Sequence, residues 1–404
     1  MSTQRRSYLI VLSGIIAFSL GCSKVNDDCN LTVYPNAPKT EWFISHSGSK
    51  DESHGHFIMS CSDGGFLQIG ETGDISKSSK LLAIKTNGNG DFIWSQEISI
   101  GEHNLGNSAI ELNDGYLICG AQDKNSSIIK LSTNGDVIWN RSFDNGGSDA
   151  FEHVVLSSNG FIAVGYINAE DDLNTFYTEG TGYITFLNNL GEKTSGKNVD
   201  LSHPYRIKPL NNDYIISGLS DGASDYGLIK VNSLGGTIWT KTFGGSKDDH
   251  CFGMDISNDG SIYLTGHTLS GTENWDTYTM KISSIGVKQW EIKQGNPRGF
   301  KPKFIHDEAW GIKATNDGGC IIVAGTGDEY GRYRRRCGND GDNSNTWHVY
   351  LIKYDVSGNV EWQRTYGGPD KIDWAGEDID LTNDGGAIIA VDNGSFGFLK
   401  VDPF

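Results

Sequence analysis

The amino-acid sequence predicts an all-β fold made of repeated four-stranded sheets. A unit of sequence recurs along the chain, and the segment 248–290 is its clearest copy. Each copy has two apolar runs joined by an Asn/Asp-Gly turn, a third run that ends near a Lys, and a fourth that carries a Trp. Asn/Asp-Gly between two short alternating runs is a strong hairpin signal, because the tight turn needs φ > 0. One copy therefore predicts one antiparallel sheet of four strands.

Two recurring residues count the copies. The third strands end with Lys85, Lys130, Lys230, Lys281, Lys353 and Lys400, and with Leu187 in a degenerate copy. The fourth strands carry Trp94, Trp139, Trp239, Trp290 and Trp362, and the copy near Gly191 lacks its Trp. Seven third strands are thus followed by only six fourth strands. The displaced Trp lies ahead of the first copy, at Trp42.

An N-terminal strand near Trp42 that completes the last sheet would close a ring and remove its exposed edges. A period of about 40–50 residues with four strands per unit is typical of a propeller. We therefore predict that residues 40–404 form a seven-bladed β-propeller closed by a strand near Trp42. An open β-solenoid is the alternative, and it leaves the position of Trp42 unexplained.

Residues 1–22 are predicted to be a lipoprotein signal peptide. Arg5 and Arg6 precede an apolar run that ends at Leu20 and is too short to span a bilayer comfortably. Small residues directly before Cys22 resemble the bacterial lipoprotein signal, so we expect lipidation of this Cys and a lipid-anchored protein of the cell envelope, at the outer membrane. An ordinary secretory signal is the alternative. Residues 23–39 are polar and aperiodic, which predicts a flexible tether.

Charge and cysteine usage exclude several classes of protein. The formal net charge is -18, which disfavours nonspecific binding to nucleic acid. Six cysteines follow Cys22, and no CxxC pair occurs among them, so neither a zinc ribbon nor a redox motif is predicted. Their spacing predicts no disulfide, and we expect a monomer.

Most of the ten histidines are predicted to lie at one mouth of the propeller. In a hairpin, the start of the first strand and the end of the second strand lie at the same edge of the sheet. Those two positions hold His54, His56, His103, His153, His203, His250, His267 and His306. The same rim collects Glu71, Tyr166, Tyr205, Arg206, Asp249, Glu308, Trp310, Trp374 and Glu377, with Tyr226 close behind. Such a cluster favours a functional face, although any single His could instead brace adjacent blades.

His, Tyr and Arg side chains around one sugar suit proton abstraction next to a carboxylate. Arg or His⁺ neutralises the carboxylate, a neutral His or Tyr takes the α-proton, and a Tyr or His protonates the leaving oxygen. This is β-elimination from a uronic acid. The chain has no nucleophile elbow, P-loop or dinucleotide fingerprint. Hydrolysis by paired carboxylates such as Glu71, Glu308 or Glu377 remains open.

Several rim segments carry a resemblance to a known family. They are SHGHFIMS, HNLGNSAIE, DAFEHVV, DHCFGM, GHTLSGTENWDTYT, NPRGFKPKFIHDEAWG and WAGEDIDLTNDGGAI. These segments resemble those of the seven-bladed propeller ulvan lyases of marine bacteria, from about Trp42 to Phe404. The resemblance implies a sulfated rhamnose–uronate polymer as substrate, cut without a redox cofactor. It also implies His and Tyr as acid and base, an Arg near the carboxylate, and a structural zinc.

Position on consecutive blades selects the candidate residues. We expect proton transfer by His103, Tyr166 and Tyr226, with Arg206 as the neutraliser of the carboxylate. His54, His153, His267 and Arg298 are expected to bind neighbouring sugars. The basic loop 332–336 could hold sulfate, or be solvated without a ligand. A zinc site could be made from His250, His306, Cys337 and His348, although the spacing is no local motif.

The competing class is a surface-anchored propeller without enzymatic activity that binds a glycan or a protein. A binding module would favour exposed Trp and Tyr platforms. An eliminating enzyme needs Arg, His and Tyr close together around one sugar.

Overall fold

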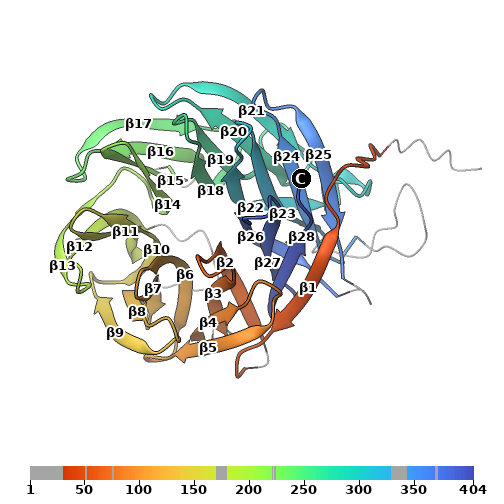
Figure 1. Ribbon diagram of the computed structural model, residues 1–404. Helices are drawn as coiled ribbons and strands as arrows, with labels where there is room; N and C mark the ends of the chain where they lie inside the picture. The colour runs from red at the N-terminus through yellow and green to blue at the C-terminus, as the bar shows by residue number, and fades with distance from the viewer. Residues whose placement is uncertain are drawn as a thin grey trace, which may run out of the picture.

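The computed structural model describes residues 31–50, 52–74, 77–169, 180–220, 222, 224–328, 344–368 and 372–404. Within these ranges the chain forms seven four-stranded antiparallel sheets, arranged like the blades of a wheel (Figure 1). The predicted seven-bladed β-propeller is therefore confirmed. One short 3₁₀-helix, η1 (Pro302–Phe304), lies among the described residues. No helix in this part of the chain is long and apolar enough to cross a membrane.

Each blade runs from the axis outward in the order of its strands. Blade 1 contains β2 (Ser53–Ser60), β3 (Phe66–Thr72), β4 (Lys80–Thr86) and β5 (Phe92–Ile98). Blade 2 contains β6 (Asn104–Leu112), β7 (Gly115–Gln122), β8 (Asn125–Leu131) and β9 (Val137–Phe143). Blade 3 contains β10 (Ser148–Ser157), β11 (Gly160–Ala169), β12 (Thr181–Leu187) and β13 (Lys193–Asn198).

The other four blades repeat this pattern. Blade 4 contains β14 (His203–Leu210), β15 (Asp213–Leu219), β16 (Tyr226–Val231) and β17 (Thr237–Phe243). Blade 5 contains β18 (Asp249–Ile256), β19 (Ile262–Thr268), β20 (Asp276–Ile282) and β21 (Lys288–Gln294). Blade 6 contains β22 (His306–Ala314), β23 (Cys320–Gly327), β24 (His348–Tyr354) and β25 (Val360–Tyr366). Blade 7 contains β26 (Ala375–Leu381), β27 (Ala387–Asp392), β28 (Phe396–Val401) and the N-terminal strand β1 (Thr40–His46).

The ring is closed by the strand that carries Trp42. In Figure 1, β1 lies beside β28, so the two ends of the described chain share one sheet. Trp42 is the register partner of Lys400, as Trp94 is of Lys85 in blade 1. The Lys and Trp that count the copies in the sequence are thus cross-strand neighbours, and Trp42 completes the last pair.

The same tryptophans join each blade to the next. Trp94 packs on the turn of blade 2 at Gly135, where an added Cβ would lie 2.6 Å from the indole, and its Nε1 donates to the Thr133 carbonyl at 3.1 Å. Gly135 has a φ of 87°, so the position favours glycine for both conformation and space. In the degenerate blade 3, Phe186 takes the place of the Trp against Gly235. This substitution accounts for the copy that lacks its Trp.

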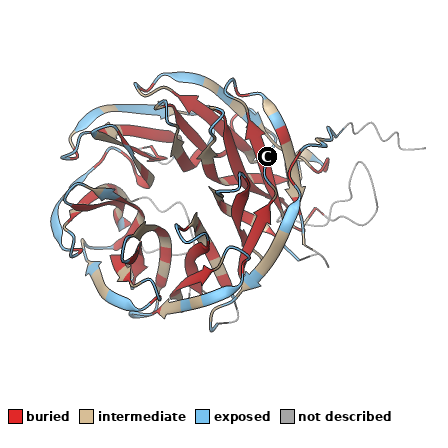
Figure 2. Cartoon of the chain, viewed as in Figure 1, coloured by how far each residue is buried: buried red, intermediate tan, exposed pale blue. Residues whose placement is uncertain are grey.

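Burial is greatest in the middle of each blade. The second and third strands of each blade are almost entirely buried, whereas the outermost strands alternate between exposed and half-buried residues (Figure 2). The last residues of the expected tether, up to residue 39, are packed against the propeller. Ala37 is buried, and the Tyr366 hydroxyl donates to the Pro38 carbonyl at 2.8 Å. The chain therefore meets the propeller several residues before β1 begins.

Candidate active site at the histidine mouth

The first strands begin, and the second strands end, on one face of the propeller. His54 is the register partner of Glu71, His250 of His267, and His203 of Leu219. These pairs bring side chains from distant parts of the chain to one opening. We call this face the histidine mouth.

A β-bulge occurs at the equivalent place in every first strand. The register skips one residue in β2, β6, β10, β14, β18, β22 and β26. The extra residues are His56, Asn107, Glu152, Tyr205, Phe252, Trp310 and Glu377, which we call the bulge ring. A bulge bends the strand and changes the direction of a side chain, and bulges are common beside active sites. The ring is the floor of the histidine mouth, one residue from each blade.

One side of the bulge ring is aromatic. The rings of Tyr205 and Phe252 lie 4.7 Å apart, and those of Phe252 and Trp310 lie 4.3 Å apart. The other side holds Glu377, His56, Asn107 and Glu152. An aromatic wall opposite hydrogen-bonding groups is the arrangement that a sugar ring requires, because a sugar presents both C–H faces and hydroxyl edges.

Tyr166 lies in a contact network between blades 3 and 4. Its ring centroid is 4.5 Å from that of His203, which stacks on Tyr205 at 4.1 Å with an interplanar angle of 14°. The Nε2 of His203 lies 2.9 Å from a carboxylate oxygen of Glu152. His203 is itself only 3% exposed, so this pair holds the wall against which half-buried Tyr166 rests. The network brings together a phenol, an imidazole and a carboxylate.

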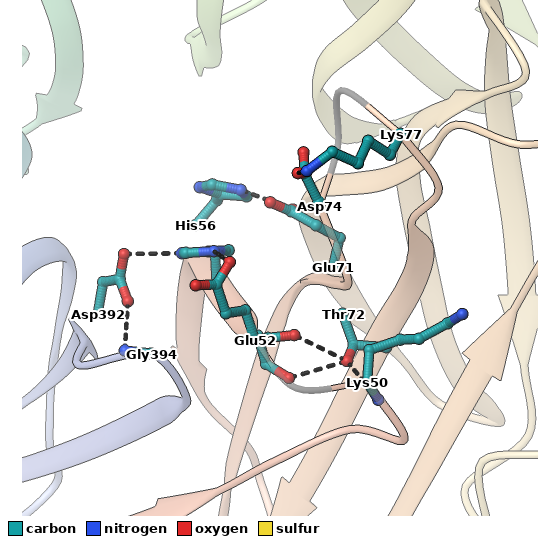
Figure 3. Close-up of polar contacts among 11 residues, drawn as sticks. Lys50, Glu52, His56, Glu71, Thr72, Asp74, Lys77, Asp392 and Gly394 are labelled. Carbon is teal, nitrogen blue, oxygen red and sulfur yellow. Dashed lines mark hydrogen bonds and ion pairs between the residues drawn. The ribbon is translucent and has the colours of Figure 1, made fainter.

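Two more histidine–carboxylate pairs lie where blade 7 meets blade 1. His56 is 2.7 Å from Glu71, and His54 is 2.8 Å from Asp392; Figure 3 shows Glu71, His56 and Asp392 in this arrangement. Burial alone would lower the pKa of His56, but the negative charge of Glu71 and the hydrogen bond to it raise this pKa to about 9. His56 is therefore an imidazolium at neutral pH. Its charge is paired with the Glu71 carboxylate on the floor of the mouth.

Glu377 of the bulge ring carries a proton at neutral pH. Burial raises its pKa to about 8, and the nearby negative charge of Asp392 acts in the same direction. In blade 6, Glu308 accepts from His306 at 3.1 Å, and this bond and charge hold the pKa of Glu308 below its usual range in spite of burial. The mouth thus places a neutral carboxyl near an ionised one.

The protonation of Glu377 predicts a pH-dependent stability. The folded state keeps a proton on Glu377 up to about pH 8, whereas the unfolded chain loses it near its ordinary pKa of about 4.3. Stability is therefore fully present below that lower pKa and falls as pH rises toward 8. We expect Glu377→Gln to reduce this fall by on the order of 2 kcal/mol. Urea unfolding at several pH values checks this, with exposed Glu192→Gln as the control; identical pH profiles of wild type and Glu377→Gln would contradict it.

Four expected site residues do not present their side chains in the mouth. Tyr226 is 0% exposed, and its hydroxyl donates to the Tyr278 carbonyl at 2.8 Å, so it packs between blades 4 and 5. Arg298 is 2% exposed and donates through one nitrogen to the Thr326 and Thr346 carbonyls, so it holds a loop together. His153 and Arg206 lie beyond the bulges of their strands and line the central cavity. Packing between neighbouring blades sets the position of each side chain, and the sequence repeat does not predict such contacts.

A variant of Tyr226 tests whether this residue has a structural role and no catalytic one. Tyr226→Phe removes the donor to the Tyr278 carbonyl and leaves a buried acceptor without that bond. We expect a loss of about 1–2 kcal/mol of stability. Turnover of any substrate at the mouth should stay unchanged within about twofold, because this buried hydroxyl is no acid–base group of the reaction. Denaturant unfolding and activity assays of the same preparation measure both. A hundredfold loss of activity without a loss of stability would show that Tyr226 takes part in catalysis.

The remaining candidates occupy the mouth with different exposure. His103 and His54 are half-buried at its rim, as expected. His267 is fully buried, with its ring 4.7 Å from that of Trp275, and burial lowers its pKa to about 3, so it is a neutral packing residue. Glu152, Asn107 and Phe252 were missed by the sequence reasoning. The sequence of a single strand carries no signal for them, because a bulge is a two-to-one count between paired strands.

The expected zinc ligands do not meet among the described residues. No group of three or more His, Cys, Asp or Glu side chains with metal-binding geometry occurs in this part of the chain. His250, His306 and His348 are described, whereas Cys337 and the basic loop 332–336 lie outside the described residues. Cys22 and the signal segment lie outside them as well. The zinc site therefore stays a prediction that the three described histidines do not support by themselves.

Comparison with known proteins defines the class. The chain matches no protein-family model, and it matches no curated protein in sequence. Its fold is similar to that of the Neurospora crassa Pan2 WD40 domain, with a TM-score of 0.57 at 10% identity, covering 87% of this chain and 90% of that one. It is also similar to a catalytically inactive virginiamycin B lyase from Staphylococcus aureus with quinupristin, with a TM-score of 0.54 at 11% identity. That match covers 89% of this chain and 99% of the lyase chain. Puromycin hydrolase is similar with a TM-score of 0.50 at 11% identity, and the match covers 86% of this chain and 50% of that one.

These likenesses establish the fold alone. The chain is a seven-bladed β-propeller, and proteins with similar blades include WD40 domains as well as enzymes. The choice between an enzyme and a binding module has to come from the chemistry of the mouth.

Proposed function

We propose that this protein is a polysaccharide lyase that cleaves ulvan by β-elimination at its uronic acid. The observation that carries the proposal is the floor of the histidine mouth. There a protonated His56, a neutral Glu377 and the Tyr166 network surround one opening, opposite an aromatic wall. An eliminating enzyme needs such a collection of proton donors, acceptors and fixed charge.

The roles follow from charge and position. The uronate carboxylate must be neutralised before its α-proton becomes acidic enough to leave. The His56 imidazolium, which is held in a pair with Glu71, is the cation that would donate to it. Tyr166 and His103 are half-buried at the rim of blades 3 and 2, where they can reach a bound sugar. One takes the α-proton and the other protonates the leaving oxygen. Glu152 and His203 position Tyr166 through ring contact and do not themselves react.

The expected substrate is a polyanion, which fits a local positive charge in a chain of net charge -18. Sulfate groups outside the uronate subsite would be held by the basic loop 332–336, with a lipid anchor at Cys22 keeping the protein in the cell envelope. Both parts are carried by the sequence and its resemblance to ulvan lyases. A catalytic metal or redox cofactor is not required by this scheme.

The proposal is tested with the signal-free protein and purified ulvan. We expect ultraviolet absorbance from an unsaturated uronyl end to rise with time, and the rate to be proportional to protein concentration. Desulfated ulvan and a neutral glucan are the substrate controls. Binding of ulvan without any unsaturated product would instead identify a glycan-binding propeller, since recognition would then occur without chemistry.

A further inference from the structure

A cavity of about 790 Å³ lies on the propeller axis and opens on the face opposite the histidine mouth. Its lining includes Asn211 and the turn 257–260, which join first strands to second strands and so lie at the far end of the blades. None of the seven bulge-ring residues lines it. The cavity is therefore separate from the proposed active site, and its volume falls in the ordinary range for small-molecule sites.

Both lysines that line the cavity are paired with carboxylates of a neighbouring blade. Lys208 lies 3.1 Å from Asp255, and Lys313 lies 3.0 Å from Asp380. These pairs connect blades 4, 5, 6 and 7, so their function is to hold neighbouring blades together. Glu111 and Asp259 also line the cavity, and neither has a Lys or Arg partner among the described residues, so the outer part of the lining is acidic.

The inner end is different, because its polar groups are not matched in this way. The only side-chain hydrogen bond that Arg206 makes to the described residues runs to the Tyr205 carbonyl at 3.2 Å, and no described carboxylate lies within ion-pair distance. His153 is 7% exposed, and its buried Nδ1 meets no hydrogen-bond partner in the described part of the chain. Asp378 also lines the cavity, and its carboxyl accepts from the Ile58 backbone at 3.2 Å. A guanidinium, an imidazole and a carboxyl thus line one cavity.

These groups select the chemistry of a ligand. An unpaired guanidinium favours a carboxylate, which it can bind through two parallel hydrogen bonds. His153 and Asp378 favour hydroxyl groups, which both donate and accept. At this inner end an ammonium group is disfavoured. Arg206 and Lys313 already place positive charge near Asp378, and they would repel a cationic ligand. Phe57, Met254 and Ile312 add an apolar wall for C–H groups.

We propose that this cavity binds a small sugar acid, of monosaccharide or disaccharide size, with its carboxylate on Arg206 and its hydroxyls on His153 and Asp378. This site does not depend on the proposed lyase activity. It would give the protein a second, independent carbohydrate contact on the face opposite the mouth.

Isothermal titration calorimetry with glucuronate tests the site. We expect wild-type protein to bind glucuronate at least tenfold more tightly than glucose, which lacks the carboxylate. Arg206→Met should weaken binding by about 10- to 100-fold, the usual size of a lost charged hydrogen bond. Arg141→Met is the matched control, because Arg141 likewise donates to the carbonyl of its preceding residue, at 3.0 Å, but lies on outer strand β9.

A second variant keeps the test decisive if Arg206→Met does not fold. Phe57 is half-buried and lines the cavity, so Phe57→Trp fills part of the space and should also abolish binding. His203→Ala, at the mouth, should leave glucuronate binding unchanged. The proposal is overturned if wild type binds no glucuronate, if glucose binds equally well, or if His203→Ala abolishes binding while Arg206→Met and Phe57→Trp keep it.

Discussion

A chain that begins at residue 51, without β1, is expected to lose its cooperative thermal unfolding. Strand β1 supplies the outer strand of blade 7 and covers the edge of β28. Its loss also removes Trp42 from the core cluster that contains Ile84 and Phe398, and Phe43 from its stack on Trp374 at 3.8 Å. The removal of a single packed aromatic commonly costs about 3–5 kcal/mol. An exposed sheet edge then adds a tendency to aggregate.

A chain that begins at residue 31 is the control for this truncation. It retains Ala37 and Pro38, which contact blade 6 through Arg364 and Tyr366, together with all of β1. We expect it to unfold at the same midpoint as the full chain. Differential scanning calorimetry compares the three proteins, and an unchanged transition in the chain that lacks β1 would show that the ring does not need this strand.

Tyr166→Phe and His103→Ala are each expected to lower turnover of ulvan by about 10²-fold or more. Each removes a proposed proton-transfer group while leaving the strands around it in place, and a lost acid–base group usually has an effect of this size. Tyr166→Phe keeps the ring that contacts His203. Its stability should therefore change little, and the loss should lie in kcat more than in KM.

Two further variants separate chemistry from positioning. His203→Ala removes the ring that Tyr166 rests on, so we expect a smaller loss of turnover than in Tyr166→Phe and a measurable loss of stability. Tyr226→Phe is the matched control for the loss of a phenol, since that hydroxyl is buried between blades. If Tyr166→Phe and His103→Ala both turn over ulvan at the wild-type rate, the acid and base lie elsewhere on the rim.

The sequence predicts the fold well because the signals for a blade are local and repeated. Lys85 and Trp94 are cross-strand neighbours joined by a short turn, and the same spacing recurs in other blades. The displaced Trp42 then predicts closure, which its pairing with Lys400 confirms. Even the copy without a Trp follows the rule physically, because Phe186 fills the same space against Gly235.

The site was predicted only in part, because it depends on register and on contacts between blades. A bulge is a two-to-one count between paired strands, so the sequence of one strand does not reveal that Glu152 or Phe252 enters the ring. Tyr226 lies at the mouth end of β16, but its buried hydroxyl donates to a carbonyl of blade 5. Arg206 likewise follows a bulge, which turns it toward the cavity. A single repeat does not encode these directions.

We propose that the histidine mouth cleaves ulvan by elimination and not by hydrolysis. The most direct measurement is mass spectrometry of oligosaccharides released from ulvan in heavy-oxygen water. β-Elimination breaks the C–O bond without adding water, so we expect products that carry an unsaturated end and no heavy oxygen. Products that have gained one heavy oxygen at each cleavage, with saturated ends, would contradict the account and favour hydrolysis by the carboxylates of the mouth.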